Sequence, residues 1–434
     1  MYVQTQKQST YGVATIPAFD LAELLFLVSV FCAPIELRVV SSLTVHDLLI
    51  LIVAGLLVVG PRRMYFVPTI FVPPMFVFLL FALLSTFRAP YPMESLTQIG
   101  QYIFIFFVHL PVVLTLVRSR FMLWASMSLF LGGALLVAGL SMMMHHVQGA
   151  GRMLTFFSDN PNRLGYPSAY MLPFLLFFLF VGWRRPRMRL LVIALIPVFY
   201  VFTWALAASG SRSSTVGAIA ALMLFFSFRQ GLQINLRLVA RILVTALVIG
   251  GSGYLLYQTH YFPDVLRDRI DRTLDFEESL VDDRRRLAIA GMLAFEDSPW
   301  IGIGLDNFRY IARDYLSEST AQPPHNLWIQ FLAQVGLVGT VMFGFLIAVW
   351  YWLMLKAQHR APTAEAREEL WALLAAFSAV QVIYLFLPIM IQRQYWLLYG
   401  LGLVTALRML EETTGAKRAG HAYRQPEQLI GVRT

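Results

Sequence analysis

The stretch that decides the fold is the second half of a long polar insertion. Residues 282–328 read DDRRRLAIAGMLAFEDSPWIGIGLDNFRYIARDYLSESTAQPPHNLW, opening on acidic and basic residues and closing on a histidine just before an apolar run restarts. The whole insertion, 258–326, lacks an apolar run long enough to cross a bilayer. In a chain that is otherwise apolar, titratable side chains gathered in one place are the first candidates for function.

The composition is that of an integral membrane protein. Of the 434 residues, 58% are hydrophobic and 14% are charged, against about 25% charged residues in soluble domains. The net charge of +9 does not indicate nucleic-acid binding, because the basic residues lie mostly in short connectors between apolar runs. We therefore expect membrane lipids and no nucleic acid as partners. The single cysteine, Cys32, excludes an intrachain disulfide and a cysteine metal cluster.

Apolar runs of about 20 residues, the length that crosses a bilayer core, recur along the chain. They predict an all-α, polytopic membrane protein, 1–434, with about twelve transmembrane helices. The predicted spans are 19–36, 42–60, 65–86, 99–117, 121–144, 166–183, 190–208, 213–228, 238–257, 327–354, 370–388 and 394–410. The insertion at 258–326 then forms one large loop between spans nine and ten, and 411–434 forms a polar cytoplasmic tail.

The basic residues orient these spans. If the N-terminus is cytoplasmic, inner connectors such as 184–189 are rich in arginine, whereas short outer connectors contain few arginines, such as Arg88. This is the positive-inside bias of membrane proteins. We therefore expect both termini in the cytoplasm and the 258–326 loop on the far side, which in a bacterium is the periplasm.

The loop itself is predicted to contain two short helices. Residues 284–297 have a stripe of small and apolar residues near helical spacing, and Ser298-Pro299 ends it. Residues 306–315 form the second helix. Asn326 is expected to cap the helix that starts at Leu327.

Arg212 is a candidate anion clamp because it lies in a short outer connector, against the orientation bias. The hydroxyls of Ser209, Ser211, Ser213 and Ser214 are expected to surround it. The alternative is an interfacial arginine that extends to lipid head groups.

Three adjacent arginines are the second candidate. Arg284, Arg285 and Arg286 would open the first loop helix, where backbone N–H groups and a guanidinium together suit a phosphate. The alternative is a solvated charge run neutralised by the two preceding aspartates. Arg163, in a turn that reads DNPNR, is a weaker anion candidate.

His325 is the candidate general base, because an imidazole titrates near neutral pH without special tuning. The alternative is a polar residue at the start of a helix. We expect no metal at His145 and His146, which are adjacent and lack helical ligand spacing. The loop carboxylates leave a magnesium site open, although no spacing favours one.

The compartment narrows the substrate class. The outer side of the membrane has no pool of ATP or nucleotide sugars, so a transfer reaction there requires a pre-activated, lipid-borne anion. A polyprenyl diphosphate has an apolar tail for the helices, a diphosphate for the arginines and a group to transfer.

Several stretches together resemble the O-antigen ligase and polymerase superfamily. In chain order, between Ser158 and Gly339, they read SDNPNRLGY, GSRSST, RRRLAIAGMLAFEDSPWIGIGLDNF and HNLWIQFLAQVGLVG. The resemblance implies a bacterial inner-membrane glycosyltransferase with a helical fold related to that of enzymes using polyprenyl-phosphate sugars. It implies transfer of a glycan from undecaprenyl diphosphate to an acceptor hydroxyl without a metal or nucleotide cofactor, at the periplasmic face.

The family's motif can be carried over position by position. Its connector arginine falls on Arg212, its loop-helix arginine best on Arg284, and its loop histidine on His325. Arg285 or Arg286 is the alternative to Arg284, and Ala288 stands where many members carry tryptophan. The predicted catalytic residues are His325, Arg212 and Arg284. The predicted substrate-binding residues are Arg285, Arg286, Arg163 and Asn326.

The resemblance implies an inverting single displacement in which arginines bind the diphosphate and His325 accepts the acceptor's proton. A lipid A–core acceptor would make the protein a ligase. A lipid-linked repeat unit would make it a polymerase of O-antigen, capsule or exopolysaccharide, which we slightly favour, with a chain-length regulator as a further candidate partner. A lipid-linked oligosaccharide flippase and a scaffold protein are the alternatives, and an enzyme requires the three catalytic side chains to converge.

Overall fold

The computed structural model describes residues 20–40, 43–148, 153–157, 160–229, 258, 278–316, 322–387 and 391–424. This part of the chain is almost entirely helical, with one antiparallel hairpin formed by β1 (Arg38–Val40) and β2 (Leu43–Thr44). The predicted all-α class is therefore confirmed.

The helices before the loop are α1 (Leu21–Cys32), α2 (Val45–Val59), α3 (Val72–Thr86), α4 (Pro92–Phe104), α5 (Leu110–Leu116), α6 (Arg120–Gln148), α7 (Asn162–Arg184), α8 (Arg189–Ser209) and α9 (Arg212–Arg229). The loop contributes α12 (Glu278–Asp297) and α13 (Phe308–Tyr315). They are followed by α14 (Leu327–Gln358), α15 (Ala364–Tyr384) and α16 (Arg393–Arg424). Short 3-10 helices lie at Thr69–Phe71 and Pro186–Met188, and a π-helical turn at Ile105–His109 joins α4 to α5.

Within the described residues, six helical segments are long and apolar enough to cross a membrane. They are Thr69–Thr86, Pro92–Leu116, Arg120–His145, Asn162–Arg184, Pro186–Ser209 and Leu327–Gln358. Every predicted span outside 238–257 contains a helix, and 238–257 lies outside the described residues. Six of the twelve predicted spans do not qualify: 238–257 is not described, α1, α2 and α9 are short, α15 begins with a charged turn, and α16 is not among the qualifying segments.

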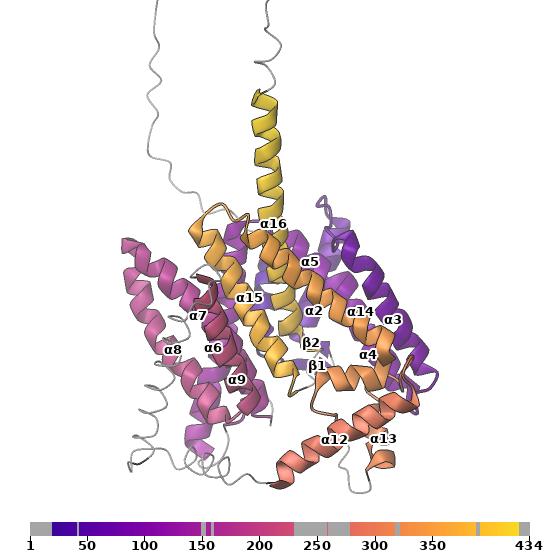
Figure 1. The fold of residues 1–434 in the computed structure, drawn as a ribbon. Helices are drawn as coiled ribbons and strands as arrows, with labels where there is room; N and C mark the ends of the chain where they lie inside the picture. Colours follow the sequence, from indigo (N-terminus) through magenta and orange to yellow (C-terminus); the bar gives the residue numbers. More distant parts are fainter. Residues whose placement is uncertain are drawn as a thin grey trace, which may run out of the picture.

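Ion pairs join the connectors at one end of the helical bundle. Arg120 contacts Glu365 at 3.2 Å, Arg184 contacts Glu368 at 2.7 Å, and Arg118 contacts Glu411 at 3.2 Å. We call this the tail end, because α16 projects from it, and the opposite end, where α12 and α13 lie, the loop end (Figure 1). The arginines assigned to one side of the membrane by the charge bias thus gather at one end of the bundle.

The loop is fixed to α14 by a turn between α12 and α13. Backbone hydrogen bonds join Leu337 N to Pro299 O at 2.7 Å and Ile303 N to Ala333 O at 2.9 Å. Gly336, with a φ of 70°, kinks α14 at this contact. Because a Cβ at Gly336 would lie 2.4 Å from the Trp300 carbonyl, the two backbones approach too closely for a side chain.

A second anchor joins the loop to the start of α4. Asn307 is buried; its side chain donates to Ser95 Oγ at 2.9 Å and accepts from the Tyr91 backbone N–H at 2.8 Å. The small-residue stripe of α12 is buried too, and a Cβ at Gly291 would meet Ile329 of α14 at 2.6 Å. These contacts hold α12 against the bundle, so that its side chains have defined positions.

Two predicted boundaries inside the loop are wrong. The first helix begins at Glu278 instead of Arg284, and the second begins at Phe308 instead of Asp306. The three arginines therefore lie in the second and third turns of α12, away from the unpaired N–H groups of a helix start. The expected phosphate site built from backbone N–H groups at Arg284 does not exist, although the guanidinium groups remain.

Candidate functional site

Arg212 is the first residue of α9. Gly210, with a φ of 57°, ends α8 in the left-handed conformation, and Ser211 Oγ accepts from the Ser214 backbone N–H at 3.4 Å. This tight reversal leaves Arg212 exposed at the surface. Because α9 starts there, the guanidinium projects from the end of a helix and not from a loose connector.

The serines around Arg212 have a different role from the predicted one. Ser209, Ser211, Ser213 and Ser214 are buried, and Ser214 Oγ donates to Ser211 Oγ at 2.7 Å. A Cβ at Gly165 of α7 would lie 2.7 Å from Ser214 Oγ, so the serine turn packs directly on that helix. The hydroxyls therefore build the turn and do not surround the guanidinium as expected.

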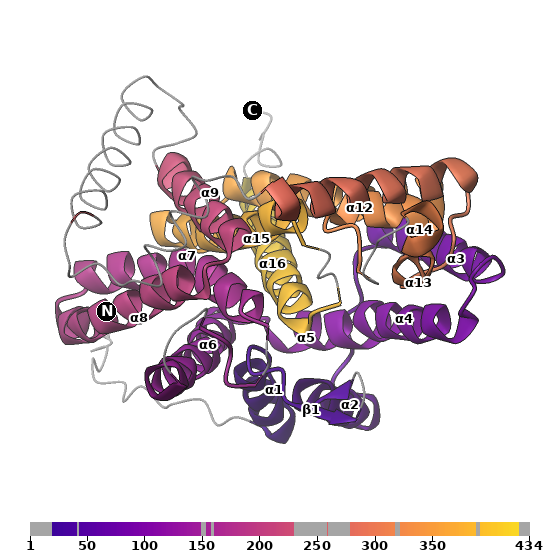
Figure 2. The ribbon, with the colours of Figure 1, turned by 90° about the horizontal axis from the view of Figure 1, so that it is seen from below.

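Arg284 of α12 lies close enough to Arg212 for the two positive charges to interact. Partial burial and the charge of Arg212 both lower the pKa of Arg284, burial being the larger cause. Seen from the loop end, the start of α12 lies near α9 and α15 (Figure 2). Among the described residues, neither arginine forms an ion pair with a carboxylate, so both charges are available to an anion.

His325 stands immediately before α14 with an unusual backbone conformation, a φ of 55°. Its Nε2 is 3.0 Å from Gln322 Oε1. Since an amide oxygen only accepts, Nε2 carries the proton and the lone pair is on Nδ1. Nδ1 is buried and has no hydrogen-bond partner among the described residues. Burial, and to a lesser extent the charge of Arg284, lower the pKa of His325, which favours the neutral base.

Electrostatic interactions link Arg212 to Arg284 and Arg284 to His325. These three residues come from the start of α9, from α12 and from the residue pair that precedes α14, so only the folded loop brings them together. Within the described part of the chain, the arrangement combines two cations that have no carboxylate partner with an imidazole whose Nδ1 has no hydrogen-bond partner. Such a site can bind an anionic leaving group and accept a proton beside it.

Arg285 and Arg286 follow Arg284 on α12, and all three arginines are exposed. Successive residues of an α-helix point about 100° apart, so the three arginines face different directions. The interaction with both Arg212 and His325 belongs to Arg284. Arg284 is therefore the arginine of the three that these electrostatic interactions favour for the site.

Arg163 is engaged elsewhere. Its Nη1 donates to Glu36 Oε2 at 2.9 Å, and the other oxygen of Glu36 accepts from Gln394 at 2.8 Å. The ion pair joins α7 to the segment between α1 and β1. Because its charge is already neutralised, Arg163 is a weaker anion site than Arg212 or Arg284.

Asn326 caps α14, as predicted. Its side-chain oxygen accepts from the backbone N–H groups of Trp328 at 2.9 Å and Ile329 at 3.1 Å. Its amide donates to Leu385 O at 3.1 Å, at the end of α15. These hydrogen bonds engage both polar groups of the Asn326 side chain, and its direct contact with a substrate stays a prediction.

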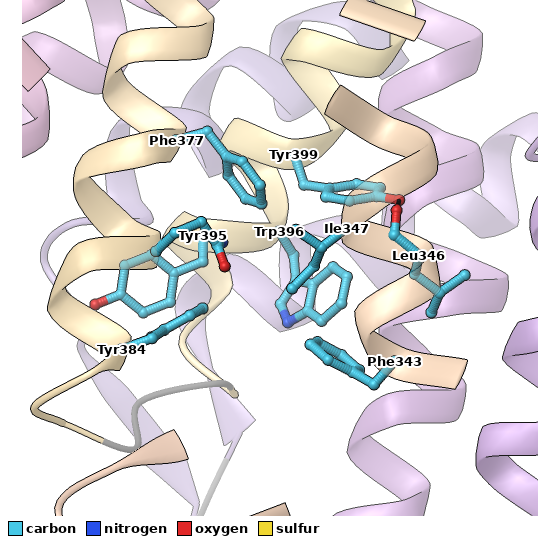
Figure 3. A pocket seen from close by; sticks show the side chains of 9 residues that line it. Phe343, Leu346, Ile347, Phe377, Tyr384, Tyr395, Trp396 and Tyr399 are labelled. Atoms are coloured by element: carbon cyan, nitrogen blue, oxygen red, sulfur yellow. Dashed lines mark hydrogen bonds between the residues drawn. The ribbon is translucent and has the colours of Figure 1, made fainter. Parts of the chain in front are cut away.

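A narrow aromatic crevice lies between α14, α15 and α16, near the Asn326–Leu385 contact. Tyr384 and Tyr395 face Trp396 and Phe343 across it (Figure 3). The Tyr395 hydroxyl is buried without a hydrogen-bond partner in the described part of the chain. The crevice is mainly apolar and is lined by side chains of α14, α15 and α16.

No three His, Cys, Asp or Glu side chains of the described residues come together as a metal site requires. Sequence reasoning missed Gln322, whose only sequence signal is its position three residues before His325. It also missed the contact of Gly336 with Trp300, which joins segments far apart in sequence.

The fold and this site define an α-helical membrane protein with a dicationic, histidine-containing site at the loop end. Residues 198–344 match the family model described as O-antigen ligase. The match runs from α8 to α14, includes Arg212, Arg284 and His325, and confirms the resemblance to the O-antigen ligase and polymerase superfamily. No curated protein matches the chain.

Proposed function

We propose that this protein is a bacterial inner-membrane glycosyltransferase of surface polysaccharide assembly. It would transfer a glycan from undecaprenyl diphosphate to an acceptor hydroxyl at the periplasmic face. The family match supports a glycan-transferring membrane enzyme. The observation that carries the proposal is the electrostatic interaction of Arg212 with Arg284 and of Arg284 with His325.

In the proposed reaction, the donor diphosphate binds between Arg212 and Arg284. The acceptor oxygen attacks the anomeric carbon as the bond from that carbon to the diphosphate oxygen breaks. The leaving diphosphate takes the electron pair, and the two guanidinium groups stabilise its growing charge. The acceptor's proton passes to His325 Nδ1, the nitrogen that the Gln322 contact leaves unprotonated. One displacement without a protein nucleophile inverts the configuration.

An apolar stripe on α9 supports a lipid-borne donor. Val216, Ile219, Met223 and Phe226 are each between 38% and 53% exposed. Their spacing of three and four residues continues from Arg212 along one face of the helix. A polyprenyl chain lying on this stripe would bring its diphosphate to the guanidinium at the helix start.

Reconstitution with a defined donor tests the proposal. The purified protein would be placed in liposomes with an undecaprenyl-diphosphate-linked glycan and either lipid A–core or a second lipid-linked glycan. A lengthening ladder of products identifies a polymerase, and a mass shift of lipid A–core identifies a ligase. Absence of transfer to both acceptors, with donor bound and protein folded, would overturn the proposal.

A further inference from the structure

A basic cleft at the tail end of the bundle, away from His325, has no part in the proposed reaction. It has a volume of about 440 Å³ and is lined by residues of α1, the α2–α3 connector and the turn between α5 and α6. Three arginines line it: Arg62, Arg63 and Arg118.

The cleft is built by fixed contacts. The Arg118 guanidinium lies 3.7 Å from the centre of the Tyr65 ring, a cation–π contact. The Tyr65 backbone N–H donates to Thr115 Oγ1 at 2.9 Å, which ties the connector to α5. Ser119 Oγ accepts from the Met122 backbone N–H at 3.0 Å and holds the first turn of α6. The arginines therefore line a defined concavity.

The charges of the cleft are only partly neutralised. Arg62 is held by Asp20 and Glu23, each at 2.9 Å. Arg118 pairs at 3.2 Å with Glu411, whose side chain is 65% exposed. Arg63 has no carboxylate partner among the described residues. An anion in the cleft could therefore bind Arg63, which has no carboxylate partner among the described residues. It could also bind Arg118, whose partner Glu411 is largely exposed to solvent.

Apolar side chains flank these arginines. Val59 is 89% exposed, Phe66 is 62% exposed and Phe121 is 47% exposed. Val59 ends α2, Phe66 follows Tyr65 in the connector and Phe121 lies at the start of α6, so each stands within three residues of a residue that lines the cleft. A ligand that satisfies both the arginines and these apolar side chains must have an anionic head and hydrocarbon chains, and it must reach the end of a membrane-spanning bundle.

We propose that this cleft is a binding site for an anionic phospholipid of the phosphatidylglycerol type. Its phosphate would lie between Arg63 and Arg118, and its acyl chains would run along Val59, Phe66 and Phe121. The site does not depend on the proposed transfer reaction, because it shares no residue with it.

Lipid binding to the full-length, delipidated protein in detergent tests this site by native mass spectrometry. We expect phosphatidylglycerol to bind at least about tenfold more tightly than phosphatidylcholine. Arg63→Gln should lower the phosphatidylglycerol affinity about fivefold, and Arg63→Lys should retain most of it. The matched control is Arg187→Gln, an exposed arginine outside this cleft, which should leave the affinity unchanged.

Three results would overturn the proposal. The first is equal binding of the two lipids, and the second is an equal loss with Arg63→Gln and Arg187→Gln. The third is displacement of phosphatidylglycerol by inorganic phosphate at matched concentration, which would show a phosphate site without lipid preference. Because Arg63 is exposed, its substitution should not alter the thermal unfolding temperature, and this measurement separates a binding defect from misfolding.

Discussion

Burial and, to a lesser extent, the positive charge of Arg284 lower the pKa of the His325 imidazole. The two residues are brought together only because α12 packs along α14. A base beside a bound diphosphate must remain neutral before the reaction. The charge of Arg284 favours the neutral imidazole. Arg284 can also stabilise the leaving diphosphate, so this one residue assists both the base and the leaving group.

The first prediction concerns pH. Because burial and Arg284 disfavour the imidazolium, the base form of His325 should persist below the ordinary histidine pKa of 6.5. The acid limb of the transfer rate should therefore lie below that pH. Removing the cation in Arg284→Gln should move this limb to higher pH, whatever it does to the maximal rate. An acid limb of the unaltered protein at or above the ordinary histidine pKa would contradict His325 as the titrating base.

The second prediction concerns the two arginines that are proposed to bind the diphosphate. Arg212→Ala and Arg284→Ala should each lower turnover by about a hundredfold or more, the usual effect of removing a charge-stabilising group. Arg285→Ala is the matched control, because it removes an exposed arginine from the same helix, and it should leave turnover close to that of the unaltered protein. Rates would be measured in liposomes at equal protein content. Equal losses for Arg284 and Arg285 would contradict the assignment.

The third prediction separates the nitrogens of His325. Gln322→Leu removes the acceptor at Nε2, lets the proton move to Nδ1 and should lower turnover about tenfold. Gln322→Glu places a carboxylate there, which should raise the pKa of His325 and move the acid limb upward by about one pH unit. A change of rate in both variants without any shift of the pH profile would assign Gln322 a structural role only.

His325 itself gives the fourth prediction. Replacement by alanine should abolish measurable transfer. In the described part of the chain, His325 Nδ1 has no hydrogen-bond partner, so no neighbouring group stands ready to accept the proton in its place. Donor binding should persist, since Arg212 and Arg284 remain. Binding of the lipid-linked donor and transfer would be measured on the same preparation. Near wild-type transfer by His325→Ala would remove the base from the mechanism.

The helices follow from local sequence, whereas the site depends on contacts between distant segments. Each apolar run that predicts a span and lies within the described residues does contain a helix. The start of α14 is also predictable, because its cap, Asn326, is the residue directly before the helix. Sequence reasoning misplaces the start of α12, because the arginines look like a helix start while the chain is already helical from Glu278. From sequence alone, the serine pattern near Arg212 suggests an anion site. The structure shows that these serines pack on Gly165, which the local pattern does not indicate because Gly165 lies far away in the sequence.

The contact between Gly336 and Trp300 provides the last prediction. Gly336 has a φ of 70°, and a Cβ added to it would lie 2.4 Å from backbone atoms of Trp300, so alanine there is both strained and in collision. Gly336→Ala should destabilise the docked loop by about 1–3 kcal/mol and lower the apparent unfolding temperature. The matched control is Gly55→Ala in α2, where a Cβ meets nothing within 4 Å. Because the loop carries Arg284 and leads to His325, Gly336→Ala should also reduce transfer. Unchanged unfolding and transfer would mean that the turn at Trp300 does not position the site.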